Sequence, residues 1–159
     1  MGWRFHQMDV KTAFLIGLIE EGVYIEQPEG FYVENKETHV CKLHRDIYGI
    51  KQAPRAWYSR IDNYLQDMGF QQSEADHNLY FLSSEVPLIL LLYVDNLFLI
   101  GDERLIDDCK SSIPVEFEMK DLGLMHYFLD LEVWQGDGCF FIGQGEYAVD
   151  FLKRIKMED

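Results

Sequence analysis

The chain has 159 residues, 48% hydrophobic and 14% aromatic, so it can bury a core and is not compositionally disordered. Its net charge of −14 opposes nucleic-acid binding over most of the surface, because phosphate neutralisation supplies most non-specific affinity. The length predicts one domain, residues 1–159. The three cysteines are odd in number and lack CxxC spacing, which argues against a disulfide framework or a zinc site: Cys41, Cys109 and Cys139.

No signal peptide or membrane span is expected. The longest apolar run, Val86–Ile100, is too short to cross a bilayer and is interrupted by Pro87 and Asp95. The sequence therefore predicts an intracellular protein of the cytoplasm or nucleus, without a membrane partner.

The first part of the chain reads as short elements separated by loops. Gln7–Phe14 is predicted to be a strand that leads into a short helical or irregular turn. Gln27–Gly30 is a turn, and Tyr32–Thr38 is a polar loop. Val40–Leu43 is apolar enough for a short strand.

Pro54–Met68 is the clearest helix, because Pro54 suits a first helical turn and Gly69 a C-terminal stop. Its apolar residues recur at helical spacing and are predicted to face the core: Trp57, Ile61, Tyr64, Leu65 and Met68.

A local basic segment, Val40–Arg60, overlaps the start of this helix. It carries a net charge of +4 and leaves −18 on the rest of the chain. Such a segment could contact phosphate groups of a nucleic acid, and it is equally compatible with charged side chains that are simply exposed to solvent. Its cations are Lys42, Arg45, Lys51, Arg55 and Arg60.

The stretch LILLLYVDNLFLIG places a carboxylate and an amide inside an apolar run. Leu88–Tyr93 and Leu97–Ile100 read as strands, and Asp95-Asn96 suit the two central positions of a tight turn because both tolerate positive φ. The flanks do not alternate strictly, which favours strands buried on both faces.

Helices and strands alternate without a βαβ rhythm in the remainder. Glu103–Ser112 is a predicted helix, while Leu129–Trp134 and Cys139–Ile142 form a predicted hairpin about Gly136-Asp137-Gly138. A last helix, about Glu146–Lys156, is expected to bury its apolar face. The pattern indicates an α+β fold. The apolar face of this last helix consists of Tyr147, Phe151, Leu152 and Ile155.

Six motifs occur in an order that resembles the reverse transcriptase of copia-type (pseudoviral) LTR retrotransposons. They are QMDVKTAFL, VYIEQPEGF, VCKLHRDIYGIKQAPRAWY, the stretch from Gly69 to Tyr80, LLYVDN, and KDLG followed by HYFLDLEV. The match covers about Gln7 to Lys156, and IYGIKQAPRAWY is its most specific part.

The resemblance implies a polymerase palm, an antiparallel sheet backed by helices, with the fingers largely missing. It implies two Mg²⁺ ions, or Mn²⁺ in their place, held by Asp9, the Val10 carbonyl and Asp95. Asp95 and Asn96 match the catalytic Asp-Asp pair of the family hairpin. In that family the ions assist attack of a primer 3′ hydroxyl on a nucleotide phosphate.

The same resemblance assigns contacts to nucleotide and template. Phe14 matches the aromatic residue that packs against the sugar and excludes a ribose 2′-OH, although a plain core Phe is an equal alternative. Leu129–Glu132 falls in the primer-gripping hairpin, and Lys120 is a candidate general acid. His39, His44 and His77 lack metal-ligand spacing. The loop beside the incoming nucleotide contributes Tyr48, Gly49, Lys51, Gln52 and Arg55.

Several departures from the family pattern weaken the expected activity. Asn96 replaces the second Asp, Asp130 replaces a Gly, and Ile16-Gly17 replaces Asn-Gly. The chain also begins eight residues before Asp9, which suggests a truncated open reading frame. We expect weak binding of primer–template and deoxynucleotide triphosphate by this chain alone, and little stability cost for Asn96→Asp at an exposed turn tip.

Three interpretations of function follow. The first is an RNA-directed DNA polymerase domain of weak or no activity alone, and the second is a non-catalytic relic or interaction module that keeps the palm fold. The third is a nucleotide-binding regulator unrelated to retroelements. The sequence does not determine the oligomeric state or the template preference.

Overall fold

A computed structural model describes residues 3–15, 22–33, 38–83, 85–136 and 139–157. Ile16-Gly17 and Asp137-Gly138, as well as most of the predicted polar loop, lie outside the described residues. The chain divides into two compact units: residues 1–11 with 69–159, and residues 12–68.

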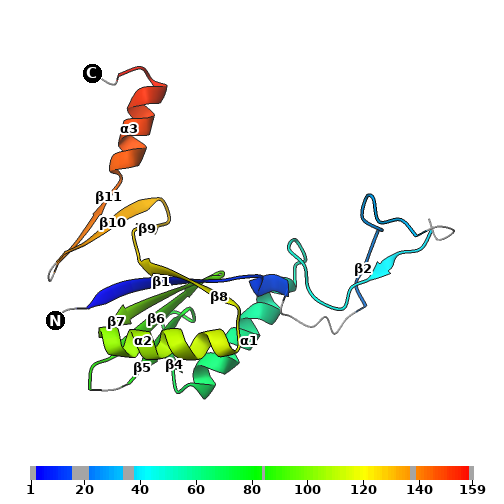
Figure 1. Cartoon of the computed structure of the whole chain (residues 1–159), viewed down its shortest axis with the longest axis horizontal. Helices are drawn as coiled ribbons and strands as arrows, with labels where there is room; N and C mark the ends of the chain where they lie inside the picture. Colours follow the sequence, from blue (N-terminus) through cyan, green and yellow to red (C-terminus); the bar gives the residue numbers. More distant parts are fainter. Residues whose placement is uncertain (1–2, 16–21, 34–37, 84, 137–138, 158–159) are drawn as a thin grey trace. The chain divides into compact units, whose positions relative to one another are not determined.

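The first unit is built on a six-stranded antiparallel sheet with the order β4-β5-β6-β7-β1-β8 (Figure 1). Because β1 comes first in sequence and lies between β7 and β8, the sheet joins segments about ninety residues apart. The strands are β1 (Arg4–Val10), β4 (Gln71–Gln72), β5 (Leu79–Leu82), β6 (Leu88–Tyr93), β7 (Asn96–Gly101) and β8 (Met119–Leu124).

Helix α2 (Glu103–Ser112) lies across one face of this sheet, and the short helix η2 (Ile113–Val115) follows it (Figure 1). The Asp102 side chain accepts a hydrogen bond from the Arg104 backbone at 3.0 Å and so caps α2. Met8, Leu97 and Leu99 are almost completely buried. Burial of such side chains contributes about 1.5–3 kcal/mol each, so this face is the main core of the unit.

A three-stranded sheet, with the order β11-β10-β9, continues the same unit and ends in helix α3 (Gly145–Arg154). Its strands are β9 (Tyr127–Phe128), β10 (Leu131–Gly136) and β11 (Cys139–Gly143). Phe98, Met125 and Val133 form a buried cluster that joins the two sheets, and Phe5 and Phe128 pack against it.

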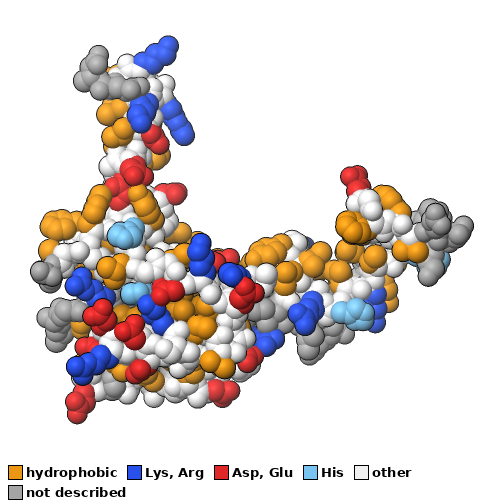
Figure 2. Space-filling model, viewed as in Figure 1, with side chains coloured by type: hydrophobic (Ala, Val, Ile, Leu, Met, Phe, Trp, Pro, Cys, Tyr) orange, Lys and Arg blue, Asp and Glu red, His pale blue; other side chains and the backbone are white. Residues whose placement is uncertain are grey.

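The last helix was predicted with the right position and the wrong burial. Figure 2 shows hydrophobic side chains exposed along α3, and no residue of α3 is buried in this chain. An apolar stripe identifies a face that is able to pack, but it does not provide the partner. The four residues that were expected to be buried are 40–61% exposed: Tyr147, Phe151, Leu152 and Ile155.

The second unit contains helices η1 (Ala13–Leu15) and α1 (Ala53–Asp67), which contact each other. It also contains the pair β2 (Tyr24–Ile25) and β3 (Cys41–Lys42). The predicted helix of residues 54–68 is confirmed, since Trp57, Ile61 and Leu65 are buried along one side. Pro54 lies in the first turn of α1, where a missing N–H costs nothing.

The mixed helices and antiparallel sheets agree with the predicted α+β class. Among the described residues, no helix combines the length and the apolar character needed to cross a bilayer.

Candidate active site

The strand β1 presents two chemically different faces. Met8 and Val10 point into the core and are each 1% exposed. Since successive side chains of a strand alternate, Phe5, Gln7 and Asp9 share the opposite face. This second face carries the candidate carboxylates.

Asp9 and Asp95 are brought together by the pairing of β1 with β7. Asp9 lies opposite Asn96 in the register, and the Val10 N–H donates to the Asp95 carbonyl at 2.8 Å. Partial burial and then the charge of Asp95 raise the pKa of Asp9, while Lys120 opposes the rise. Two carboxylates separated by 86 positions of sequence therefore share one local electrostatic environment.

The turn between β6 and β7 is displaced by one residue from the predicted position. Tyr93 pairs with Asn96, so the central residues are Val94 and Asp95 rather than Asp95 and Asn96. Val94 has φ 58°, while neither Asp95 nor Asn96 has positive φ. A β-branched residue with positive φ is strained, so this backbone is held by the surrounding sheet and not by the local preference of Val94.

Asn96 is half-buried in a strand and is not at an exposed tip, as the sequence had suggested. Its Oδ1 accepts a hydrogen bond from Gln7 Nε2 at 2.8 Å, and its Nδ2 donates to Asp95 Oδ1 at 3.0 Å. The amide thus links β1 to the Asp95 carboxylate. A carboxylate at position 96 would lose the donor that satisfies Asp95, so the substitution Asn96→Asp is not electrostatically neutral.

Lys120 lies opposite Asp9 on the other neighbour of β1, strand β8. The pairing of β1 with β8 shifts by one residue: Gln7 pairs with Gly123, but the next residue, Met8, pairs with Asp121. Leu122 is therefore the extra residue of a β-bulge in β8. Gly123 adopts φ 78°, and its N–H donates to Asp121 Oδ1 at 2.8 Å. The KDLG motif is therefore a bulge that bends β8 beside Asp9.

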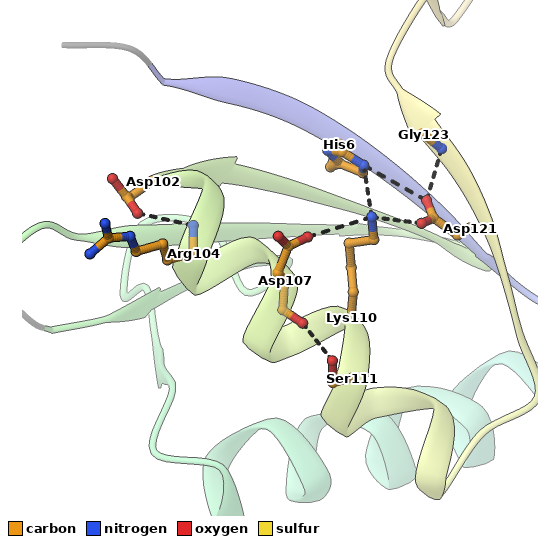
Figure 3. A network of polar contacts seen from close by, with 8 residues as sticks. All are labelled: His6, Asp102, Arg104, Asp107, Lys110, Ser111, Asp121 and Gly123. Carbon is orange, nitrogen blue, oxygen red and sulfur yellow. Dashed lines mark hydrogen bonds and ion pairs between the residues drawn. The ribbon is translucent and has the colours of Figure 1, made fainter.

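A polar network fixes this bulge to the core side of the sheet (Figure 3). Lys110 of α2 donates to Asp121 Oδ2 at 2.7 Å, and its Nζ lies 3.1 Å from His6 Nε2. Burial and then the Lys110 charge lower the pKa of His6, so a neutral His6 is able to accept from Lys110. Burial would raise the pKa of Asp121, but the bonds from Lys110 and Gly123 outweigh it and hold that pKa low.

The predicted primer-gripping segment, Leu129–Glu132, is split between two structural roles. Leu129 and Asp130 have φ 48° and 62°, and they form the tight turn that joins β9 to β10. Asp tolerates this left-handed conformation, whereas Leu is strained there. The buried Glu132 carboxylate accepts from the Glu146 N–H and so caps α3.

The β9–β10 turn and the β6–β7 turn are joined by aromatic rings. The ring of Phe128 lies 5.0 Å from Phe98 and 6.1 Å from Tyr93, both edge-to-face. Phe128 directly precedes the β9–β10 turn and Tyr93 directly precedes the turn that carries Asp95, so the ring contact links these two turns.

The other predicted site residues belong to the second unit. The rings of Phe14 and Tyr48 meet edge-to-face with centroids 5.0 Å apart. Gly49 has φ 95°, and a Cβ added there would meet only open space, so backbone conformation and not crowding requires glycine at this position. Lys51 and Arg55 are exposed, and Gln52 is half-buried at the start of α1.

Asp9 and Asp95 are both half-buried. Two hollows in the described surface are lined by Glu132, Trp134 and Glu146, and neither is lined by Asp9 or Asp95. Within the described ranges, no three His, Cys, Asp or Glu side chains gather as a metal-ligand group. Asp9 and Asp95 are two carboxylates, and the residue beside them at position 96 is an amide, Asn96.

The sequence of this chain matches one family throughout. The family described as "Reverse transcriptase (RNA-dependent DNA polymerase)" matches residues 1–159. The chain belongs to this reverse transcriptase family. The predicted copia-type resemblance is thereby confirmed, because similar curated proteins are named as transposon polyproteins.

Three relatives show the extent of the similarity. The "Retrovirus-related Pol polyprotein from transposon TNT 1-94" of Nicotiana tabacum is 39% identical over 158 residues, which is 96% of this chain and 12% of that protein. The corresponding polyprotein from transposon RE1 of Arabidopsis thaliana is 37% identical over 98% of this chain and 11% of its own length. The "Putative transposon Ty5-1 protein" of Saccharomyces cerevisiae is 39% identical over 80% of this chain and 42% of its own length.

The chain therefore spans about an eighth or less of the two plant polyproteins. No solved structure matches it significantly.

Sequence reasoning missed the residues that organise the site through tertiary contacts. Gln7 and Lys110 bind Asn96 and Asp121 across the sheet, and Gln135 binds the backbone of β1. No local pattern marks a glutamine or lysine for such a contact. The one usable sequence signal was that Gln7 precedes Asp9 by two positions, which places both side chains on the same face of a strand.

Replacing Lys110 with Met should lower the free energy of unfolding by about 1 kcal/mol at pH 7, because a partly exposed ion pair is lost. The pKa of Asp121 is lower in the folded state than in the unfolded state. The ion pair therefore stabilises the fold fully at pH values above the unfolded-state pKa of Asp121, and this stabilisation is lost as pH falls through its folded-state pKa. Urea titrations should therefore show that the stability difference between the two proteins shrinks as pH falls below the ordinary Asp pKa of 3.8.

Lys153→Met is the matched control for Lys110→Met, because Lys153 forms an exposed pair with Asp150 at 3.4 Å. It should change stability by less than half as much. An equal effect of both substitutions, or a Lys110→Met effect that does not change with pH, would contradict the role of this network.

Val94→Gly should raise the free energy of unfolding by about 1 kcal/mol, because glycine adopts φ 58° without strain. Val94→Ala retains a Cβ and should give little of this gain. Urea unfolding of the three proteins measures the difference. Destabilisation by Val94→Gly beyond that of Val94→Ala would show that the turn is not strained.

Proposed function

We propose that this chain is the catalytic palm of a copia-type reverse transcriptase, which extends a primer on a nucleic-acid template with deoxynucleotide triphosphates. The observation that carries the proposal is the register of β1 and β7, which brings Asp9 beside the turn of Asp95. Both carboxylates are half-buried and neither lines a described hollow, which suits contact with the end of an extended duplex better than enclosure of a small molecule.

The side chains at this face suit hard divalent cations. Asp9 and Asp95 are oxygen ligands of the kind that Mg²⁺ prefers, and the Val10 carbonyl follows Asp9 directly. Burial and then the charge of Asp95 raise the pKa of Asp9, and a cation between the two carboxylates would relieve their repulsion. When bound, Mg²⁺ or Mn²⁺ would lower the pKa of the primer 3′ hydroxyl and neutralise charge on the leaving pyrophosphate.

The chain's own residues supply positioning and proton transfer in this proposal. Asp9 and Asp95 would hold the cations, and Asn96 orients the Asp95 carboxylate by donating to its Oδ1 at 3.0 Å. Lys120 lies opposite Asp9 in β8, and in this proposal it is the acid that would give a proton to pyrophosphate. The turn of Leu129 and Asp130 contacts the primer strand.

Residues of the second unit bind the nucleotide and template in the same proposal. Lys51 and Arg55 are exposed and suit phosphate contact, and the Phe14–Tyr48 ring pair suits stacking against a sugar or base. Net charge of −18 outside the basic segment keeps affinity low, so binding to primer–template is weak at physiological salt.

A non-catalytic role is the second candidate, and Asn96 is the observation that favours it. The family pair of two carboxylates is reduced to one carboxylate and one amide. The amide donor of Asn96 also occupies one oxygen of Asp95. Both features lower the affinity for a second cation relative to an Asp-Asp pair.

Mn²⁺ binding tests the proposed site directly. Asp9→Asn and Asp95→Asn should each weaken Mn²⁺ binding at least tenfold in a titration of free Mn²⁺ followed by electron paramagnetic resonance. Asp108→Asn removes an exposed carboxylate of α2 and should have no effect. Equal Mn²⁺ affinity in all four proteins would exclude a cation site at Asp9 and Asp95.

Asn96→Asp separates the catalytic and non-catalytic candidates. Without metal it should lower the free energy of unfolding by about 1–2 kcal/mol, because Asp95 loses a donor and gains a negative neighbour. With Mn²⁺ present the loss should reverse, and Mn²⁺ affinity should rise about tenfold, or 1.4 kcal/mol. Asn63→Asp, an exposed change of the same charge in α1, should show neither effect.

Templated primer extension completes this comparison. Four proteins are assayed: the original chain, Asn96→Asp, and each of these joined to the segment that precedes the matched region in the tobacco relative. The catalytic proposal expects clear extension from the joined Asn96→Asp protein and little from the original chain. Absence of extension from every protein, despite Mn²⁺ binding, would favour the non-catalytic role.

A further inference from the structure

Gln135 makes an unusual set of contacts with the main chain of β1. Its Oε1 accepts from the Phe5 N–H at 2.9 Å, and its Nε2 donates to the Phe5 carbonyl at 2.9 Å. The same Nε2 donates to the Met125 carbonyl at 3.0 Å. One amide side chain therefore connects β10, β1 and the segment between β8 and β9.

These bonds replace a missing part of the sheet. β8 pairs with β1 only from His6 onward, so Phe5 lies just beyond the end of that ladder. The Met125 N–H donates to the Phe5 carbonyl at 2.9 Å, and Gln135 satisfies the Phe5 N–H. Because an unpaired backbone group in a partly buried position is costly, the Gln135 amide takes the place of a neighbouring peptide.

The contacts around Gln135 also set the direction of the β9–β10 hairpin. Gln135 is bonded to Phe5, near the start of β1. Phe128, at the other end of the hairpin, contacts the rings of Phe98 and Tyr93. These two residues lie farther toward Asp9, because Phe98 pairs with Gln7 of β1 and Tyr93 pairs with Asn96, which in turn pairs with Asp9. The hairpin segment from Gln135 to the turn of Leu129 and Asp130 therefore runs alongside the β1 segment from Phe5 to Asp9. The two segments are similar in length, four to six residues each, or roughly 13–20 Å at the rise of a strand.

We propose that Gln135 is a positioning residue that sets the distance between the β9–β10 turn and the carboxylates Asp9 and Asp95. Gln135 does not touch the reacting atoms. It fixes the far end of the hairpin on β1, and the aromatic contacts of Phe128 transmit that position to the turn. The inference rests on the proposed function in one respect, which is that the turn contacts a primer end held at those carboxylates.

The test compares Gln135→Leu, Gln135→Glu and the control Gln71→Leu by nuclear magnetic resonance on the full chain. Leu has a similar volume and makes none of the three bonds. Glu keeps an acceptor for the Phe5 N–H but turns a carboxylate toward two carbonyls. Gln71 is an exposed glutamine of β4, so its replacement reports on the loss of an amide alone.

In Gln135→Leu, the Phe5 amide should exchange with solvent at least tenfold faster, and the cross-peak between the Phe128 and Tyr93 rings should fall at least threefold. Exchange of the Leu90 and Leu99 amides should stay within twofold of the Gln71→Leu control. If Gln135→Leu does not fold, Gln135→Glu decides by the same ring cross-peak. A retained cross-peak in the folded variants, or a uniform acceleration of exchange through β6 and β7, would overturn the proposal.

Mn²⁺ gives a further measurement that a purely structural role would not change. In the original chain, bound Mn²⁺ should broaden the amide signals of both Asn96 and Asp130. In Gln135→Leu it should broaden Asn96 alone, while broadening of Asp130 to the original extent would overturn the proposal. If Mn²⁺ broadens neither signal in any protein, the proposed cation site fails, and the ring cross-peak still decides the role of Gln135.

Discussion

The antiparallel pairing of β1 with β7 is the constraint on which the candidate site depends. It buries Met8, Val10, Leu97 and Leu99 on one face, and the same register brings Asp9 opposite Asn96 on the other. Apolar burial on the first face offsets the repulsion between carboxylates on the second. A slip of one residue would exchange the faces and bury Asp9, so the core residues specify the position of the carboxylates.

Asn96 changes the electrostatics of this face in two opposite directions. In the chain without metal, its amide donates to Asp95 and accepts from Gln7, so it lowers the repulsion near Asp9. In the function proposed above, a negative charge at this position would be favourable only with a cation bound. A residue that stabilises the metal-free fold would then weaken the proposed cation site, which would be a local form of the trade-off between stability and activity.

The sequence predicted those features that are determined by local chemistry. The helix over residues 103–112 is observed with the same bounds, and Pro54 lies in the first turn of α1 as expected. The turn after Tyr93 was predicted one residue too late, because Asp and Asn suit positive φ intrinsically whereas the strand register forces it on Val94. Strand β8 was not recognised, since its two charged residues and its bulged glycine obscure the alternation of a strand.

The contacts of the candidate site were less accessible from sequence, because they join distant segments. The proximity of Asp9 and Asp95 came from family resemblance and not from spacing. Gln135 and Gln7 are ordinary polar residues of strands until the fold places a backbone amide or a side-chain carbonyl opposite them. The exposed face of α3 illustrates the converse, in which a clear helical pattern carried no information about its partner.

Three of the four described non-glycine residues with positive φ in the first unit lie in two turns, and the fourth, Lys156, follows α3. Val94 lies in the β6–β7 turn, Leu129 and Asp130 form the β9–β10 turn, and all three have φ between 48° and 62°. Val and Leu in this region cost about 1–3 kcal/mol each, whereas Asp130 tolerates it, so each turn contains one residue in a conformation that it does not prefer. The strands that flank them are paired, and Phe128 joins the turns through Tyr93. The paired strands therefore hold Val94 and Leu129 in conformations that they would not adopt alone, in two turns that are linked by the contact of Phe128 with Tyr93.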